Sequence, residues 1–308
     1  MTQLEVGTYH FTHTSQGTNY IDLTKSDTLA NCKNKQQFKN GRPLGYVVTA
    51  RFSNAANEIQ TIPTGWVQTN SLVKAAAAWR KMYKKAGLSK KDLNTYGREL
   101  RLPMTKAHRE NWGNEAHDII ANGLPSDYRT QEYNSDGDTI TVYATTDGST
   151  LIGVELQNAF DLTTVTIPSP DGSAGNAIDW SPFVLADGTS LADKTDSVLY
   201  QYVTSRGSQE VEDKDIESSQ GMASSNYLIQ ALSDNEETSD DVIENVKDLG
   251  DFRPYSLENQ IQARTKAVAA GTNVAGQDTS FIAPCGLIEW TGSESDVLTL
   301  TVSAIVEM

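Results

Sequence analysis

Apolar and polar residues alternate in short runs along most of this chain, and a period of two is typical of half-buried β-strands. The turn signal Asn40-Gly41-Arg42-Pro43 directly precedes one of the clearest runs, LGYVVTARF. Polar segments with Asp-Gly, Pro and Ser separate the later runs. The alternation predicts strands at Leu4–Phe11, Thr18–Thr24, Leu44–Phe52, Glu58–Trp66, Asp138–Thr145, Thr150–Gln157, Leu162–Ile167, Phe183–Ala186, Ser197–Ser205, Asn226–Leu232, Phe281–Ala283, Leu287–Trp290 and Val297–Val306.

The period changes to that of a helix over residues 70–122. Asn70 or Ser71 can cap the first helix, and Gly87 can end it. A second helix is predicted from Ser89 to Pro103, and a third within Lys106–Asn122 with a bend near Gly113. On the first helix one arc is apolar, with Leu72, Ala75, Ala76, Trp79, Met82, Tyr83 and Ala86, and the opposite arc holds Lys74, Arg80, Lys81, Lys84 and Lys85.

Many short strands with polar connections predict an all-β fold, a sandwich or jelly roll, rather than an α/β fold. We interpret the chain as one jelly roll or two, with a basic helical insertion at about residues 70–122. The first predicted domain covers residues 1–160 and includes the insertion. The second covers residues 161–308.

Charge is divided unequally along the chain. Residues 25–109 hold 17 of the 25 Lys and Arg residues and only four acids, although the whole protein has a net charge of −15. Two interpretations of the basic segment follow. It can face phosphates of lipid headgroups or nucleic acid, or it can dock on the acidic remainder of the protein or of a neighbouring copy. The phosphate-facing residues predicted from the sequence are Arg80, Lys81, Lys84, Lys85, Lys90, Lys91, Arg98 and Arg101.

Motifs for catalysis, nucleotide binding and metal binding are not found in the sequence. His10 and His13 are three residues apart, which places them on opposite faces of a strand. Cys32 and Cys285 lack any local signature of a nucleophile, so we expect small buried side chains there. We therefore expect no enzymatic activity, no metal and no cofactor.

The first residues lack a basic and an apolar signal region, and no apolar run is long enough for a membrane helix. The protein is therefore expected to be made in a cytoplasm without a signal peptide or a transmembrane segment.

The layout resembles the major capsid proteins of small icosahedral viruses, in particular the double jelly-roll type of tailless phages with an internal membrane. The resemblance involves Asp251-Phe252-Arg253-Pro254-Tyr255, the segment FIAPCGLIEW (Phe281–Trp290) and the terminal strand DVLTLTVSAIVEM. It implies a virion protein that assembles into trimers, with minor capsid proteins as further partners. It also implies that the basic insertion Ser71–Arg109 faces a membrane or genome.

The alternative class is a carbohydrate- or receptor-binding β-sandwich, such as a fibre tip or lectin. Its binding platform would be an exposed Trp66, Trp180 or Trp290. A glycoside-active β enzyme is a third class, but it needs a matched pair of carboxylates that the sequence does not identify.

Overall fold

The structure is a computed structural model that describes about half of the chain. The described residues are 7–14, 17–31, 35–54, 57–85, 100–112, 114, 116–124, 140–145, 151–156, 165–167, 176–178, 181–182, 197–199, 201–202, 264–271 and 276–308. For residues 82–85 and for strands β6 to β9 it describes the backbone alone. This part is mostly antiparallel β-sheet, with 43% of residues in strands and 24% in helices, as an all-β class requires.

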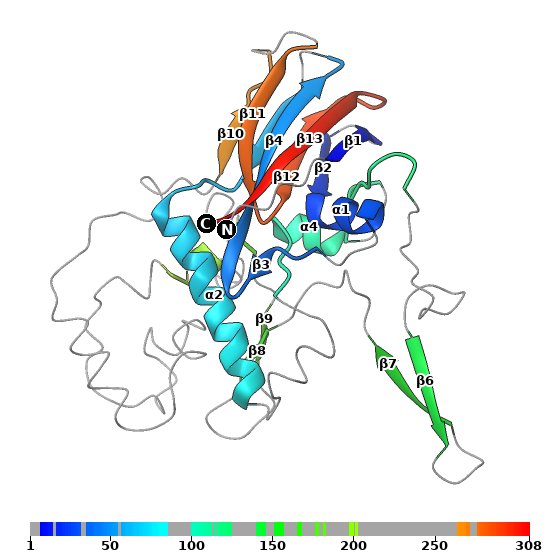
Figure 1. Cartoon of the computed structure of the whole chain (residues 1–308), viewed down its shortest axis with the longest axis vertical. Coiled ribbons are helices and arrows are strands. Elements are labelled where there is room, and N and C mark those ends of the chain that lie inside the picture. Colours follow the sequence, from blue (N-terminus) through cyan, green and yellow to red (C-terminus); the bar gives the residue numbers. More distant parts are fainter. Residues whose placement is uncertain are drawn as a thin grey trace, which may run out of the picture.

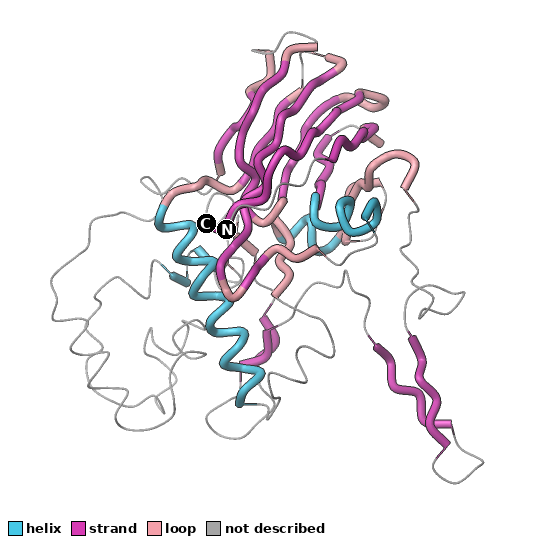
Figure 2. Tube along the Cα trace, viewed as in Figure 1, coloured by secondary structure: helices cyan, strands magenta, loops and turns pink. Residues whose placement is uncertain are grey.

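Two antiparallel sheets form the upper part of the described structure (Figures 1 and 2). The first has the order β1-β13-β4-β11, with β3 paired to β4, and the second has the order β10-β5-β12-β2. The strands of the first sheet are β1 (Gly7–Thr12), β3 (Phe38–Lys39), β4 (Arg42–Phe52), β11 (Asp278–Pro284) and β13 (Val297–Glu307). Those of the second are β2 (Gly17–Asp22), β5 (Glu58–Thr61), β10 (Thr265–Val268) and β12 (Leu287–Gly292).

The two sheets enclose one apolar core, because alternate residues of each strand point inward. Phe11, Val48 and Leu300 from the first sheet and Ile59 and Trp290 from the second are buried in it. The predicted alternation at Leu44–Phe52 and Val297–Val306 is confirmed by strands β4 and β13, which pair along most of their length. Burial of this surface is the main favourable term for the sandwich.

Strands from both ends of the chain interleave in this sandwich. β1, β2, β4 and β5 precede residue 62, whereas β10 to β13 follow residue 264. The strands of this sandwich therefore come from both sides of the predicted boundary at residue 160, and residues 62–264 separate β5 from β10 along the chain.

Helix α2 (Trp66–Lys85) covers a second apolar core below the sandwich (Figure 2). Leu72, Ala75, Ala76 and Trp79 are buried there, as the apolar arc predicts. The helix begins four residues before the predicted cap at Asn70, because the carbonyl of Gly65 accepts the first helical hydrogen bond from Thr69 N–H. Strand β5 ends at Thr61 and not at Trp66 as predicted, since Trp66 is already the first residue of α2.

Two further predictions need correction. The strand predicted to end at Thr24 ends at Asp22, and helix α1 (Leu23–Asn31) begins directly after it. Asp22 caps this helix by accepting a hydrogen bond from Thr24 N–H at 2.8 Å. The strand predicted at Ser197–Ser205 is absent from its described part, where Val198, Leu199, Gln201 and Tyr202 are helical. Tertiary packing overrides propensity here, since Val198 and Tyr202 are buried in the core below the sandwich.

The remaining described elements lie within the insertion. α4 (Lys106–Glu110) begins at the cap Thr105 and confirms the start of the third predicted helix. β6 (Ile140–Thr145) pairs with β7 (Leu151–Leu156), and β8 (Val165–Ile167) pairs with β9 (Asn176–Ile178). The strands predicted at Phe183–Ala186 and Asn226–Leu232 lie outside the described residues.

Candidate functional site

The predicted phosphate-facing residues divide into four groups. Arg80 and Lys81 lie on α2 with half-buried side chains. Lys84 and Lys85 lie at the end of α2, where the backbone alone is described. Lys90, Lys91 and Arg98 lie outside the described residues.

Arg101, the fourth group, is buried, which differs from the phosphate-facing position predicted for it. Its guanidinium donates to Asp22 Oδ2 at 2.6 Å, to Thr24 Oγ1 at 2.8 Å and to the Lys35 carbonyl at 3.1 Å. Both charged side chains are almost fully removed from solvent. Arg101 thus follows the other interpretation of the basic segment, docking on an acid of the same protein.

The β3–β4 hairpin brings further cations beside α2. Its turn residues Asn40 and Gly41 have φ angles of 53° and 83°, as in a type I′ turn, which confirms the predicted turn signal. Gly41 lies against the Arg80 guanidinium, where a Cβ would approach Nη1 to 2.9 Å. We define the basic surface as the described cations of the hairpin tip and of α2: Lys39, Arg42, Lys74, Arg80 and Lys81.

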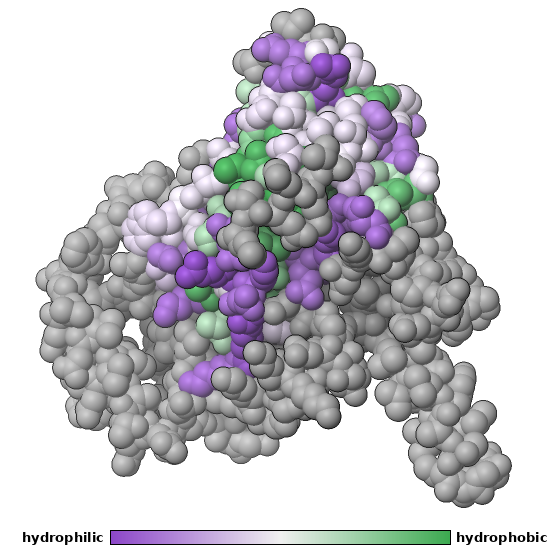
Figure 3. All heavy atoms as spheres, in the orientation of Figure 1, coloured by the Kyte–Doolittle hydropathy of each residue, from purple (hydrophilic) through white to green (hydrophobic). Residues whose placement is uncertain are grey.

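Helix α2 contributes cations to this surface and contains no acidic residue of its own. Lys39 pairs with Glu307 at 3.3 Å, while Arg42 and Lys74 are exposed. Figure 3 shows hydrophilic residues gathered over α2 and the hairpin. The apolar face of α2 is buried in the core, so this helix can meet a charged partner only through its polar face.

A second buried ionic cluster lies between α1 and the segment after α4. Lys25 Nζ donates to Asp118 Oδ2 at 2.7 Å and lies 4.9 Å from the centre of the Trp112 ring. His108 Nε2 is 3.5 Å from Asp118 Oδ1, and its ring stacks on Tyr20 at 4.7 Å. Burial alone would raise the pKa of Asp118, but the His108 imidazole and the Lys25 ammonium outweigh it and hold that pKa well below its usual range.

These charges anchor the covering segment, residues 116–122, across the edges of β1 and β2. Tyr20 N–H donates to the His117 carbonyl at 2.7 Å, and Ile119 N–H donates to the Tyr20 carbonyl at 3.0 Å. Asn122 N–H donates to the His10 carbonyl at 2.7 Å. Ile119 and Ala121 are buried in the sandwich core. At this covered edge the Tyr20 N–H and the carbonyls of Tyr20 and His10 are thus hydrogen-bonded, and Ile119 and Ala121 close the core.

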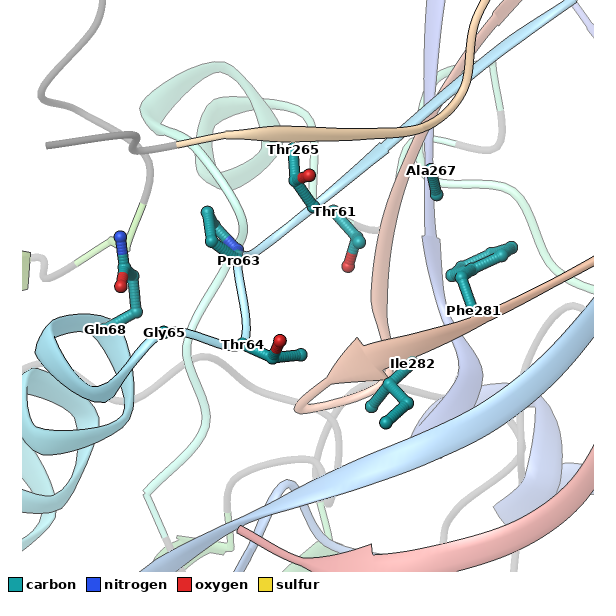
Figure 4. Close-up of a pocket in the computed structure, with 9 residues that line it drawn as sticks. All are labelled: Thr61, Pro63, Thr64, Gly65, Gln68, Thr265, Ala267, Phe281 and Ile282. Carbon is teal, nitrogen blue, oxygen red and sulfur yellow. The ribbon is translucent and has the colours of Figure 1, made fainter.

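The opposite edge, formed by β10 and β11, is the open edge (Figure 1). Within the described residues β11 pairs with β4 alone and β10 with β5 alone. A pocket of about 520 Å³ lies here, with Phe281 and Ile282 on one side and Thr61 and Thr64 on another (Figure 4). Thr265 and Ala267 of β10 also line it, and no lining residue is charged.

The open edge was not among the sites predicted from the sequence. A signal for it exists, because the adjacent apolar residues Phe281 and Ile282 break the alternation of β11. One of two such neighbours must face outward. Ile282 is 37% exposed, whereas Phe281 packs against the sandwich core.

Exposure differs among His10, His13 and the described cysteine. His10 is exposed and His13 is buried against Trp290, with ring centres 4.8 Å apart, so their predicted placement on opposite faces is confirmed. Cys285 is buried, and burial raises the pKa of its thiol. No group of three His, Cys, Asp or Glu residues able to hold a metal occurs among the described residues.

The three tryptophans predicted as a glycan-binding platform differ in exposure. Trp66 is 54% exposed at the start of α2, whereas Trp290 is fully buried and donates to Asn57 Oδ1 at 2.8 Å. Trp180 lies outside the described residues. Only Trp66 is thus left, within the described part, as an aromatic contact for a glycan.

None of the helices in the described ranges has the length and apolar character needed to cross a membrane. Comparison with protein-family models, curated proteins and solved structures found no match to the chain.

Proposed function

We propose that the protein is a non-catalytic structural subunit of an icosahedral viral shell, built on a jelly roll and assembling with copies of itself. The observation that carries the proposal is the strand order. When the eight main strands are numbered along the chain, 1 pairs with 8, 2 with 7, 3 with 6 and 4 with 5. An antiparallel ribbon with this pairing, folded into two facing sheets, is the arrangement of jelly rolls, which are common in viral capsids.

In this proposal the described strands form one roll. In a double roll, the second would have to lie within residues 62–264, because the fourth strand is β5 and the fifth is β10. It would then be inserted into the first roll and would not follow it along the chain. Trimeric capsomers and contact with minor capsid proteins in the virion belong to the same proposal.

Within a shell, the basic surface would face the phosphates of a membrane or a genome. Arg42, Lys74 and Lys81 supply point charges there, which suits electrostatic attraction to phosphate without reading of base sequence. The variant Arg42→Glu/Lys74→Glu/Lys81→Glu should keep the fold but lose at least tenfold in binding to vesicles of anionic lipid or to nucleic acid at low salt. The control is Arg51→Glu/Asp278→Arg, which preserves a surface ion pair on the sandwich. Equal binding by the triple variant would contradict this role.

The primary test is the mass of the purified full chain, measured by light scattering on a sizing column at several concentrations. A trimer, or growth into large particles, supports the shell proposal. A monomer at every concentration contradicts it.

A second candidate is a carbohydrate-binding sandwich, favoured by the exposure of Trp66, since jelly rolls also occur in lectins. Glycan binding that quenches tryptophan fluorescence in the wild type and is lost in Trp66→Ala would favour it. Trp66 carries the only exposed indole in the described part, so that loss would be specific.

A further inference from the structure

The covered edge shows what closes this sandwich. An extended segment, residues 116–122, bonds to the backbone of β1 and β2 and inserts Ile119 and Ala121 between the sheets. Neither inserted residue is charged, and each is only 4% exposed. The partner that fits such an edge is therefore an extended strand with small or medium apolar side chains at alternate positions.

The open edge offers the same two features without a cover among the described residues. β11 presents the unpaired backbone groups of an edge strand, and the pocket beside it exposes part of Ile282. An edge strand of this kind is a template for pairing with another chain. The pocket, lined by hydroxyl, amide and apolar groups, can accept one uncharged side chain of the added strand.

We propose that the open edge is a contact between copies of this chain, in which a second copy adds an extended segment along β11 and inserts an apolar side chain into the pocket. The proposal rests on the proposed function, since it names the surface through which shell subunits associate. It differs from the basic surface in its physical basis, which is backbone pairing and apolar burial.

Charge favours a second copy as the occupant at this place. The chain has a net charge of −15, so two copies repel each other over most approaches. Near the open edge the exposed charges neutralise one another: Arg51 binds Asp278 through two hydrogen bonds of 2.7 and 2.9 Å, and Lys266 binds Glu58 at 2.9 Å. A neutral edge with an uncharged pocket matches an uncharged segment and does not match a phosphate polymer.

The test compares two exposed apolar residues of equal exposure. Ile282→Lys places a charge in the pocket, whereas Val297→Lys places the same charge at the start of β13, outside the pocket; both side chains are 37% exposed. Thr265→Lys repeats the change from the β10 side. Association of the full chains is measured by sedimentation velocity at several concentrations, and circular dichroism checks that each variant is folded.

We expect Ile282→Lys and Thr265→Lys to weaken association at least tenfold, about 1.4 kcal/mol, because a charge buried without a partner is costly. Val297→Lys should associate like the wild type. Salt should strengthen the contact, since it screens repulsion between acidic chains.

Three outcomes overturn the inference. If the wild type associates and Ile282→Lys associates equally well, the open edge is not the contact, while the shell proposal stands. If the wild type stays monomeric at all concentrations and salts, both the inference and the shell proposal fail. Glycan binding that Ile282→Lys abolishes would likewise reassign the pocket to the carbohydrate alternative.

Discussion

The two edges of this sandwich are both formed by antiparallel strands, but a further segment of the chain covers only one of them within the described residues. At the covered edge, residues 116–122 lie across β1 and β2, and Ile119 closes the core. At the open edge, β10 and β11 flank a pocket, with Ile282 partly exposed. The difference is therefore the covering segment, residues 116–122, and the buried Lys25–Asp118 ion pair that holds it in place.

The cations of the basic segment differ in the same way, since some are buried in ion pairs and others are exposed. Arg101 and Lys25, although they belong to the basic stretch, are buried and paired with Asp22 and Asp118. Arg42 and Lys74 of the same stretch remain on the surface. The buried Arg101 and Lys25 bind acids of the same chain at the covered edge. The side chains of Arg42 and Lys74 are exposed to solvent.

The largest expected effect comes from breaking the Arg101 contact. Arg101→Met should lower the free energy of unfolding by about 3–5 kcal/mol, because it leaves the Asp22 carboxylate buried and unpaired. Urea unfolding followed by circular dichroism measures this. Asn can still cap α1, so Asp22→Asn/Arg101→Met should lose less than the sum of the two single changes. Lys74→Met is the surface control, and an equal loss in that variant would contradict the assignment.

The next effect concerns the charge on Asp118. Asp118→Asn should cost about 3 kcal/mol at pH 7, since Lys25 loses its anion but keeps the Trp112 ring. The folded-state pKa of Asp118 is lowered, so its stabilisation is complete above the unfolded pKa, about 4, and is lost as pH falls toward the folded value.

The difference between wild type and Asp118→Asn should therefore shrink between pH 5 and pH 2. Urea unfolding at pH 7, 4 and 3 measures it. A difference that is independent of pH would show that the carboxylate is not charged in the folded protein.

The smallest expected effect is that of removing an isoleucine side chain from the open edge, and the covered edge offers an isoleucine for direct comparison. Ile119→Ala should cost about 2–4 kcal/mol through the cavity it leaves in the core. Ile282→Ala, at the open edge, should cost less than about 1 kcal/mol. Thermal unfolding at low protein concentration tests both, and equal losses would mean that the open edge is already covered within one chain.

Sequence patterns predicted the sandwich strands well where alternation was long. β4 and β13 lie almost where LGYVVTARF and VLTLTVSAIV place them, since a half-buried strand needs alternating residues. The apolar arc of α2 was also predicted, although its start moved from Asn70 to Trp66 because Gly65 serves as the cap. Helix α1 was missed, since it is only nine residues long and most of its buried side chains are polar or charged, which the sequence pattern does not indicate.

The candidate site was less predictable, because its parts meet only in three dimensions. Arg101 has the same charge as Arg80, and nothing local distinguishes a buried arginine from a half-buried one. Its partner, Asp22, is 79 residues away. The pocket likewise joins Thr61 of β5, Thr265 of β10 and Ile282 of β11, which no sequence spacing relates.

By itself, the sequence determined the class of the fold, the period of its main strands, the amphipathic face of α2 and the concentration of positive charge between residues 25 and 109. These are local properties, because hydrophobic period and charge are written in neighbouring residues. Tertiary structure alone decided that both ends of the chain build one sandwich, which cations are buried, and which edge has no cover among the described residues. Those outcomes depend on contacts between distant residues, whose energies no local pattern encodes.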